Sequence, residues 1–164
     1  MIKLRKSEGF SLVELMIVVA IMAILAAIAI PSFMKFSMKA KTSEATQNLG
    51  AIRTGEEGYR SENDDYLACP GGTATAYPAA IPPASGTLWV DTAAGAFPTI
   101  GFQADGKVRY RYAVTVTNPT DGPPQFVATA EGDLDEDGTS AVYTLNTSDT
   151  ANYPKATLAP AGEF

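Results

Sequence analysis

A long apolar segment near the N-terminus dominates the pattern of hydrophobic and polar residues. Residues 10–30 read FSLVELMIVVAIMAILAAIAI and contain a single charged side chain, Glu14. As an α-helix this segment would be about 31 Å long, which matches the hydrocarbon core of a bilayer. The preceding residues, MIKLRKSEG, carry three basic side chains, which the positive-inside rule places on the cytoplasmic side. The pattern predicts a membrane-crossing helix followed by an exported domain.

The helical pattern continues beyond the apolar segment. Between Ser32 and about Glu62 there is no proline, and apolar residues recur at spacings near three, four and seven. Residues 10–62 therefore predict one helix of about 50 residues, whose second half, 32–62, is amphipathic. The residues expected on its buried face are Met38, Ala45, Leu49, Ile52 and Tyr59.

Two further features of this helix can be read from the sequence. The i,i+4 pairs Arg53 with Glu57 and Glu56 with Arg60 are expected on the solvent face, where each adds a few tenths of a kcal/mol. Pro31 lies inside the helix and removes one backbone hydrogen bond, so a bend is expected there.

Residues 63–164 are predicted to form a globular head. Residues 63–104 are rich in Pro, Gly, Ala and Thr and have no sustained period, so an ordered, exposed loop region is expected. Three segments with alternating, β-branched or aromatic residues then predict strands: 107–117, 125–130 and 140–145. They would form a small antiparallel sheet of three or four strands that covers the second half of the helix. The predicted fold class is α+β.

Composition disfavours several classes of function. The chain has no histidine, and it shows no nucleophile motif or phosphate loop, so an enzyme is not expected. The formal net charge is −6, and residues 61–164 carry four basic against thirteen acidic side chains, so direct nucleic-acid binding is not expected. The single cysteine, Cys69, cannot form a disulfide within this chain and is expected to be a packed side chain, as is Trp89.

Glu14 needs a partner, because an ionised carboxylate inside an apolar segment costs a few kcal/mol or more. No Lys or Arg lies within one helical turn of it. Cleavage before Phe10 would create an α-amino group one turn away, which could pair with Glu14 of the same chain or of a neighbouring subunit. The alternative is a glutamate that reaches the membrane interface unpaired. A signal peptide cut at Ala27-Ile28-Ala29 is disfavoured, because its apolar run would be long and would contain Glu14.

The residues around this position resemble a known processing site. The run Lys6-Ser7-Glu8-Gly9-Phe10-Ser11-Leu12-Val13-Glu14 is similar to the type IV prepilin motif, and the similarity continues through LMIVVAIMAILAAIAIPSF, including Pro31. In that family a membrane aspartic peptidase cleaves after the glycine and methylates the new amine. The resemblance therefore implies cleavage between Gly9 and Phe10, N-methylation of Phe10, and neutralisation of the Phe10 amine by Glu14 of a neighbour.

The resemblance also implies an organisation and a set of partners. Residues 1–9 would be a removed leader peptide, 10–31 the transmembrane and filament-core helix, 32–62 its amphipathic continuation and 63–164 the head. The subunit would wait in the inner membrane with its head in the periplasm. It would then enter a helical homo-oligomeric filament with the help of a prepilin peptidase, an inner-membrane assembly platform and an ATPase. Filaments of this family often unwind before such a proline, so residues 26–31 are expected to soften.

One acidic turn suggests a metal. In GDLDEDGTSAVYTL, Asp133, Asp135, Asp137 and Gly138 occupy the first, third, fifth and sixth positions of a calcium-loop pattern. The twelfth position is Thr144, and the flanks are predicted strands, so an EF-hand is excluded. The major pseudopilins of type II secretion, which the chain also resembles, stabilise their heads with calcium. Two interpretations stay open, a Ca²⁺ site and a solvated acidic hairpin.

Three functions remain after these arguments. The first is a subunit of a type IV pilus, serving adhesion, motility or DNA uptake. The second is a pseudopilin of a type II secretion system, which forms a short periplasmic filament. The third is a membrane-anchored binding domain that does not polymerise, and it leaves Gly9, Phe10 and Glu14 unexplained.

Overall fold

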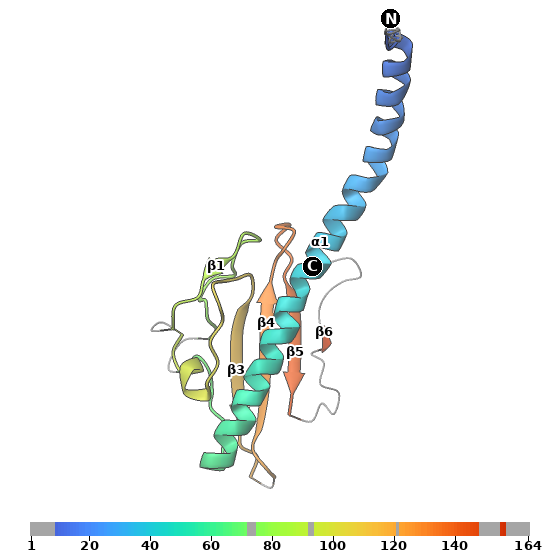
Figure 1. Ribbon diagram of the computed structural model, residues 1–164. Coiled ribbons are helices and arrows are strands. Elements are labelled where there is room, and N and C mark those ends of the chain that lie inside the picture. The colour runs from blue at the N-terminus through green and yellow to red at the C-terminus, as the bar shows by residue number, and fades with distance from the viewer. Residues whose placement is uncertain (1–8, 72–74, 92–93, 121, 148–154, 157–164) are drawn as a thin grey trace, which may run out of the picture. The chain divides into compact units, whose positions relative to one another are not determined.

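The structure is a computed structural model that describes residues 9–71, 75–91, 94–120, 122–147 and 155–156. The chain divides into an N-terminal unit, Met1–Ser37, and a C-terminal unit, Met38–Phe164. One helix, α1 (Leu12–Asn63, 52 residues), begins in the first unit and continues into the second. With the small antiparallel sheets of the C-terminal unit (Figure 1), it confirms the predicted α+β class.

The N-terminal unit consists of the first part of α1, and its surface is apolar on all sides. Every described residue from Gly9 to Phe36 is exposed, including the large side chains of Leu12, Ile17 and Phe33. The helix is long and apolar enough to cross a membrane, with a mean hydropathy of 2.9 in its most apolar window. A helix that is hydrophobic all round belongs in a membrane or among other helices.

The main sheet of the C-terminal unit is antiparallel, in the order β3-β4-β5-β6. Its strands are β3 (Arg111–Thr117), β4 (Gln125–Gly132), β5 (Ala141–Asn146) and β6 (Lys155–Ala156). The first three form the predicted meander, with Tyr112 paired to Ala130 and Ala130 to Tyr143. The two-residue strand β6 was not predicted, because so short a segment shows no alternation.

The predicted strand 107–117 is wrong in one respect, because the structure divides it. Lys107–Val108 form β2, which pairs with β1 (Thr87–Leu88) in a separate two-stranded sheet. The interruption has a local cause. The backbone N–H of Arg109 donates to Oε1 of Glu44 on α1, at 2.7 Å, so the chain turns toward the helix before β3 begins.

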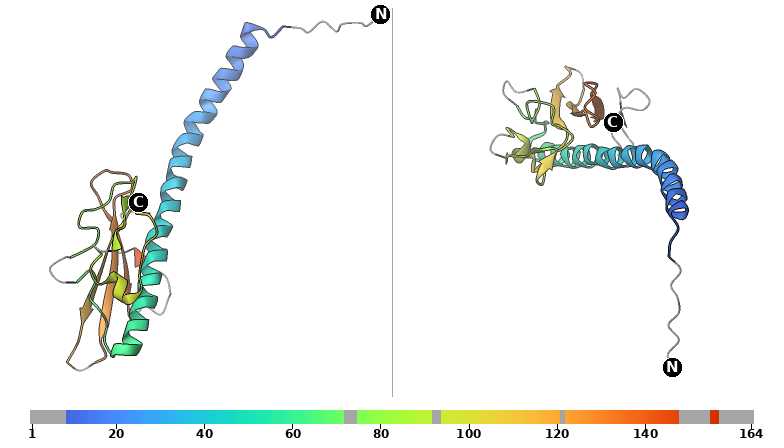
Figure 2. Two further views of the ribbon diagram at one scale, coloured as in Figure 1. Left: turned by 60° about the vertical axis from the view of Figure 1, so that its left-hand side comes forward. Right: turned by 90° about the horizontal axis from the view of Figure 1, so that it is seen from above.

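The second part of α1 packs on one face of the main sheet (Figures 1 and 2). The expected helical positions Ala45, Leu49 and Ile52 are fully buried, whereas Tyr59 is only partly buried. On the sheet side, β4 alternates between buried and more exposed residues along its whole length. The buried strand residues of this core are Tyr112, Val114, Phe126, Ala128, Ala130 and Leu145.

Residues 63–104 were expected to be an ordered, exposed loop region; most of the described backbone is irregular, as expected, but the expectation that the region is exposed is wrong for several of its side chains. Trp89 is buried at the centre of an aromatic cluster, with ring centroids 4.9 Å from Tyr77, 5.5 Å from Phe97 and 5.4 Å from Phe102. Backbone bridges tie the segment to the free edge of β3, pairing Cys69 with Val114 and Tyr77 with Tyr112. The prediction that Cys69 and Trp89 are packed side chains is confirmed. The extent of the core could not be predicted, because an irregular backbone can bury side chains without any sequence period.

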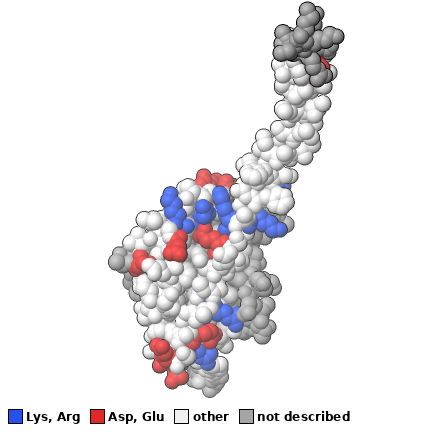
Figure 3. Space-filling view, in the orientation of Figure 1, with Lys and Arg blue, Asp and Glu red and all other residues white. Residues whose placement is uncertain are grey.

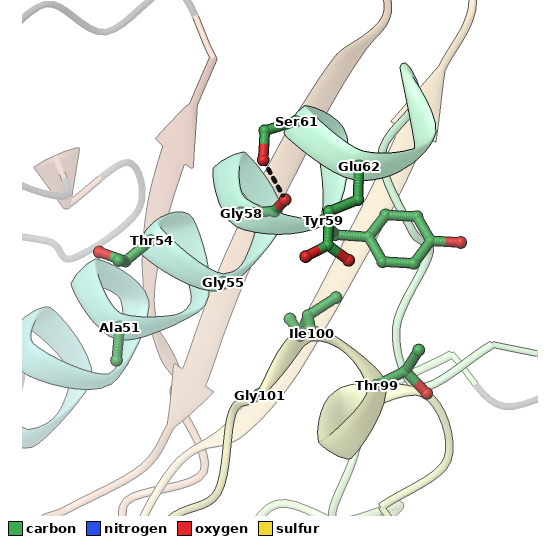
Figure 4. Close-up of a pocket in the computed structure, with 10 residues that line it drawn as sticks. All are labelled: Ala51, Thr54, Gly55, Gly58, Tyr59, Ser61, Glu62, Thr99, Ile100 and Gly101. Carbon is green, nitrogen blue, oxygen red and sulfur yellow. Dashed lines mark hydrogen bonds between the residues drawn. The ribbon is translucent and has the colours of Figure 1, made fainter.

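Gly55 allows the 3₁₀-helix η2 (Phe97–Ile100) to approach α1 closely (Figure 4). A Cβ atom at Gly55 would lie 2.3 Å from the carbonyl oxygen of Ile100. The other two glycines in this part of α1 differ, because a Cβ at Gly50 or Gly58 would meet no atom within 4 Å. Of these three glycines, Gly55 is the one that the packing of the described residues requires.

Candidate functional site: the start of α1 and the polar groups of the C-terminal unit

The helix α1 begins with a capping box. The hydroxyl Oγ of Ser11 accepts a hydrogen bond from the backbone N–H of Glu14 at 3.2 Å, and Oε2 of Glu14 accepts one from the backbone N–H of Ser11 at 3.0 Å. This reciprocal pair satisfies two backbone donors that have no partner inside the helix. Glu14 thus has a local role in addition to the predicted one, and its other oxygen, Oε1, has no hydrogen-bond donor among the described residues.

The predicted cleavage position lies just before this cap. Gly9, Phe10 and Ser11 are outside the helix, and the Phe10 side chain is 73% exposed. A peptidase needs an accessible backbone, and these residues offer one. Cleavage and methylation stay predictions for Gly9 and Phe10.

Pro31 lies inside α1, and residues 26–31 are helical in the structure. Pro31 has no backbone N–H, so the carbonyl of Ala27 loses its usual helical donor. The softening of residues 26–31 was predicted for an assembled filament, and it stays a prediction for that state.

The three aspartates of the acidic turn come together. One carboxylate oxygen from each of Asp133, Asp135 and Asp137 can be chosen so that all lie within 4.8 Å of one another. Partial burial, a hydrogen bond with Asp133 and the charge of Asp137 raise the pKa of Asp135. Oxygen ligands of this kind suit Ca²⁺, so these are the residues that could hold one.

The same turn is also held by its own hydrogen bonds. Asp133 accepts the backbone N–H groups of Glu136 at 2.7 Å and Gly138 at 3.0 Å, and Asp137 accepts that of Thr139 at 2.7 Å. Short side-chain-to-backbone bonds of this type order a turn without a metal. The Ca²⁺ site and the solvated acidic hairpin are both compatible with this geometry.

A buried carboxyl group joins α1 to the segment that follows it. Glu56 is fully buried, and its Oε2 accepts the backbone N–H of Leu67 at 2.9 Å. The thiol of Cys69 lies 3.9 Å from its Oε1. Burial raises the pKa of Glu56 to about 7 and that of Cys69 to about 12, so this thiol is protonated and unreactive at neutral pH.

The expected solvent-exposed pair of Glu56 with Arg60 is therefore wrong. Arg60 instead donates to the hydroxyl of Tyr66 at 2.8 Å, and its guanidinium lies 5.1 Å from the centre of the Tyr66 ring. Glu56 is covered because the chain folds back over α1 after Asn63. No local pattern in the sequence could have indicated that contact.

Comparison with known proteins shows similarities that are strongest in the N-terminal part of the chain. A model of the prokaryotic N-terminal methylation motif matches residues 4–30. The type IV major pilin protein PilA of Myxococcus xanthus is 56% identical over 61 residues, which are 37% of this chain and 28% of that pilin. The N-terminal segment of this chain is therefore similar to that of type IV pilins and carries the methylation motif.

Two further relatives show the same kind of partial similarity. The prepilin peptidase-dependent protein D of Escherichia coli is 36% identical over 90 residues, 51% of this chain and 62% of that protein. The type IV major fimbrial protein FimA of Dichelobacter nodosus is 48% identical over 50 residues, 30% of this chain and 32% of that protein. The chain thus spans less than two thirds of each of these pilin relatives. No solved structure matches it significantly.

One residue of the candidate site was not predicted from the sequence. Ser11 forms the N-cap of α1, and the signal was present, because Ser-x-x-Glu before an apolar run is the pattern of a capping box. This pattern was not considered, because Glu14 was interpreted only as a charge that needs a cationic partner. The relatives are named as pilin and fimbrial subunits, which agrees with a structural role and not with catalysis.

Proposed function

We propose that this chain is a subunit of a type IV pilus, made as a membrane-anchored precursor and cut between Gly9 and Phe10. The observation that carries the proposal is the surface of the N-terminal unit, which is exposed throughout residues 9–36 and carries no charged side chain between Glu14 and Lys35. Such a helix is stable in a lipid bilayer or in a bundle of like helices. The helix would first lie in the lipid bilayer. In a filament with the N-terminal helices at its core, it would then lie in a bundle of like helices.

Glu14 has the central role in the transfer from membrane to filament. Its Oε2 accepts the Ser11 amide, and its Oε1 is available for a second donor. The methylated amine of Phe10 in a neighbouring subunit is a cation that can bind there. Pairing these two charges removes the cost of a lone carboxylate among apolar helices, so it favours insertion of a subunit in one axial position.

The proposed route from membrane to filament determines on which side of the membrane each part of the chain lies. The basic residues before Gly9 stay on the cytoplasmic side, and the C-terminal unit lies in the periplasm until assembly. A prepilin peptidase, a membrane platform and an ATPase would process and extrude the subunit, since this chain has no nucleotide-binding motif. Adhesion, motility or DNA uptake would then be properties of the assembled pilus.

A pilus is favoured over a pseudopilus by the names of the relatives, which include a type IV major pilin and a type IV major fimbrial protein. One observation supports the pseudopilin of a type II secretion system instead. The clustered carboxylates of Asp133, Asp135 and Asp137 could bind a calcium ion in a chain whose single cysteine leaves no disulfide to secure that region.

The intact mass and N-terminal sequence of the chain, measured in sheared cell-surface material and in membranes, test the proposal. A chain that begins at methylated Phe10 in the sheared material supports the pilus. The same chain confined to the envelope supports a pseudopilus. A start at Met1 or Ile30 in both fractions would contradict filament assembly by this route.

The substitution Glu14→Gln separates the filament subunit from a mere membrane tether. Glutamine keeps the capping box, because its amide oxygen can also accept the Ser11 N–H, but it removes the charge. We expect a normally cleaved chain that stays in the membrane fraction. Glu62→Gln, a neutralisation at an exposed position of α1, is the matched control and should leave assembly unchanged.

A further inference from the structure

Three lysines follow the apolar segment of α1 in close succession. They are Lys35, Lys39 and Lys41, and no other charged residue lies between Glu14 and Glu44. On the face shown in Figure 3, the upper part of α1 is largely white, and Lys and Arg side chains first appear toward the lower end of that stretch. These three lysines are called the basic collar below.

The collar is not neutralised within the described part of the chain. Lys35 and Lys39 are exposed, and Lys41 is partly buried. No ion pair among the described residues involves any of the three. The next acidic residue along the helix, Glu44, is already paired, because its Oε2 lies 3.1 Å from Nη1 of Arg109. The collar therefore keeps three positive charges without a counter-charge among the described residues.

The lysines surround the helix and do not form a stripe along it. The chain is helical throughout this stretch. At about 100° per residue, Lys35 and Lys39 point about 40° apart, whereas Lys41 points about 120° from Lys35 and about 160° from Lys39. The three span only about 9 Å along the axis. A partner that docks on one face of a helix contacts residues at spacings of three, four and seven. A ring of charge instead fits a flat layer that the helix passes through.

The position of the collar along α1 matches the level of the lipid headgroups. When residues 10–30 fill the hydrocarbon core, Lys35 is about 8 Å and Lys41 about 17 Å beyond Ile30 along the axis. The headgroup layer on each side of the core is about 5–8 Å thick. Lysine side chains can bend back along a helix, and charges within a Debye length of about 10 Å are still attracted to a charged surface. All three lysines can thus act on the headgroups.

The side chains next to these lysines are large, apolar and exposed. Phe33 is 74% exposed, Met34 53% and Phe36 73%. Contiguous exposed apolar groups of this size are typical of a surface that contacts a partner or a membrane. At the boundary of a bilayer, the rings can contact acyl chains while the neighbouring ammonium groups contact phosphates. This mixture of groups favours a lipid layer over an acidic protein as the partner of the collar.

We propose that the basic collar binds anionic phospholipid headgroups in the leaflet on the periplasmic side of the membrane. The inference rests on the proposed membrane-anchored precursor and adds the partner that holds it at one depth. The ammonium groups contact phosphate oxygens, and the attraction weakens as the salt concentration rises. A fixed depth of α1 would keep Gly9 and Phe10 at the opposite, cytoplasmic face.

A fluorophore at position 40 can measure which lipids surround the collar. Ala40 is exposed, and in Ala40→Cys the native Cys69, which is only 2% exposed, should not be labelled. The labelled full chain is placed in phosphatidylcholine vesicles that carry a nitroxide quencher on either phosphatidylglycerol or phosphatidylcholine. We expect the phosphatidylglycerol quencher to be about threefold more effective, and this ratio to fall to near one at about 0.5 M salt. Equal quenching by the two lipids at low salt would overturn the proposal.

Matched charge variants identify the residues responsible. The triple variant Lys35→Gln, Lys39→Gln, Lys41→Gln should bring the quenching ratio to near one. The corresponding triple arginine variant keeps the charges and should keep the ratio. Changing the three basic residues before Gly9 to glutamine removes the same number of charges from the other end of the apolar segment, so it should leave the ratio unchanged. A ratio that persists without the collar, or that is lost with the other three charges, would contradict the proposal.

This experiment separates the collar from the proposed function. It uses the uncut chain in vesicles, so its result does not depend on cleavage or on filament assembly. Selective quenching in a chain that cells never assemble into filaments would refute the proposed pilus and leave the lipid contact in place. Equal quenching in a chain that cells cut and assemble normally would refute the lipid contact alone.

Discussion

Glu56 and Leu67 connect the end of α1 to the segment that returns over it. The carboxylate of Glu56 has no exposed surface and accepts the Leu67 N–H at 2.9 Å, eleven residues further along the chain. The bridge between Cys69 and Val114 then extends the same segment along the edge of β3. One side chain of the helix thus holds the connection between helix and sheet in place.

This contact makes the stability of the C-terminal unit depend on pH. Burial raises the pKa of Glu56 to about 7 in the folded state, whereas the unfolded chain has a pKa near the ordinary value of 4.5. The folded state therefore holds the proton more tightly. The stabilisation by the protonated form is complete below pH 4.5, falls as the pH rises, and is lost above about pH 7.

The change should amount to at most about 3 kcal/mol in the free energy of unfolding. It can be measured with the fluorescence of Trp89 during urea unfolding of the full chain in detergent, at several pH values between 4.5 and 8. Glu56→Gln should remove most of this slope. An unchanged slope in that variant would show that another group titrates.

Two glycines of α1 should respond oppositely to the same substitution. Gly55→Ala places a methyl group 2.3 Å from the carbonyl oxygen of Ile100, so η2 must move, and we expect a loss of about 1–3 kcal/mol. Gly58→Ala meets no atom within 4 Å and should stabilise the helix by up to about 1 kcal/mol. Thermal unfolding of both variants gives the comparison. Equal changes in both would mean that the close approach of η2 and α1 is absent in solution.

The sequence predicted those elements whose signal is local. The apolar run, the period of Ala45, Leu49 and Ile52, and the alternation in β4 each lie within one segment, and the structure has them. The burial of Glu56 and of Trp89 depends on contacts between distant segments. In an irregular backbone such as residues 63–104 nothing periodic records which side chains face inward, so the sequence predicted that Trp89 packs but not which residues surround it.

At the candidate site, too, the features that could be predicted are those with a local signal in the sequence. Phe10 and Glu14 were indicated by a charge that needed a partner in an apolar run.

The capping box at the start of α1 predicts that Ser11 and Glu14 have separable roles. Ser11→Ala removes one acceptor of the cap, which costs about 1 kcal/mol of local helix stability. Amide hydrogen exchange of residues 12–14 in detergent should become faster. Cleavage and assembly should stay close to normal, because the Glu14 charge remains. An assembly defect as severe as that of Glu14→Gln would mean that the cap, and not the charge, is what assembly requires.

The acidic turn provides the last prediction, because its three carboxylates repel one another unless a cation is bound. In the presence of a chelator, Asp135→Asn should leave the thermal stability unchanged or raise it by a fraction of 1 kcal/mol, since it relieves repulsion at an exposed position. The backbone hydrogen bonds made by Asp133 and Asp137 would persist. Asp105→Asn, at another exposed carboxylate, is the control. A midpoint that rises with added Ca²⁺ in the wild type but not in Asp135→Asn would identify the turn as a calcium site. In that case the bound ion stabilises the hairpin by neutralising the three carboxylates, which repel one another when no cation is present.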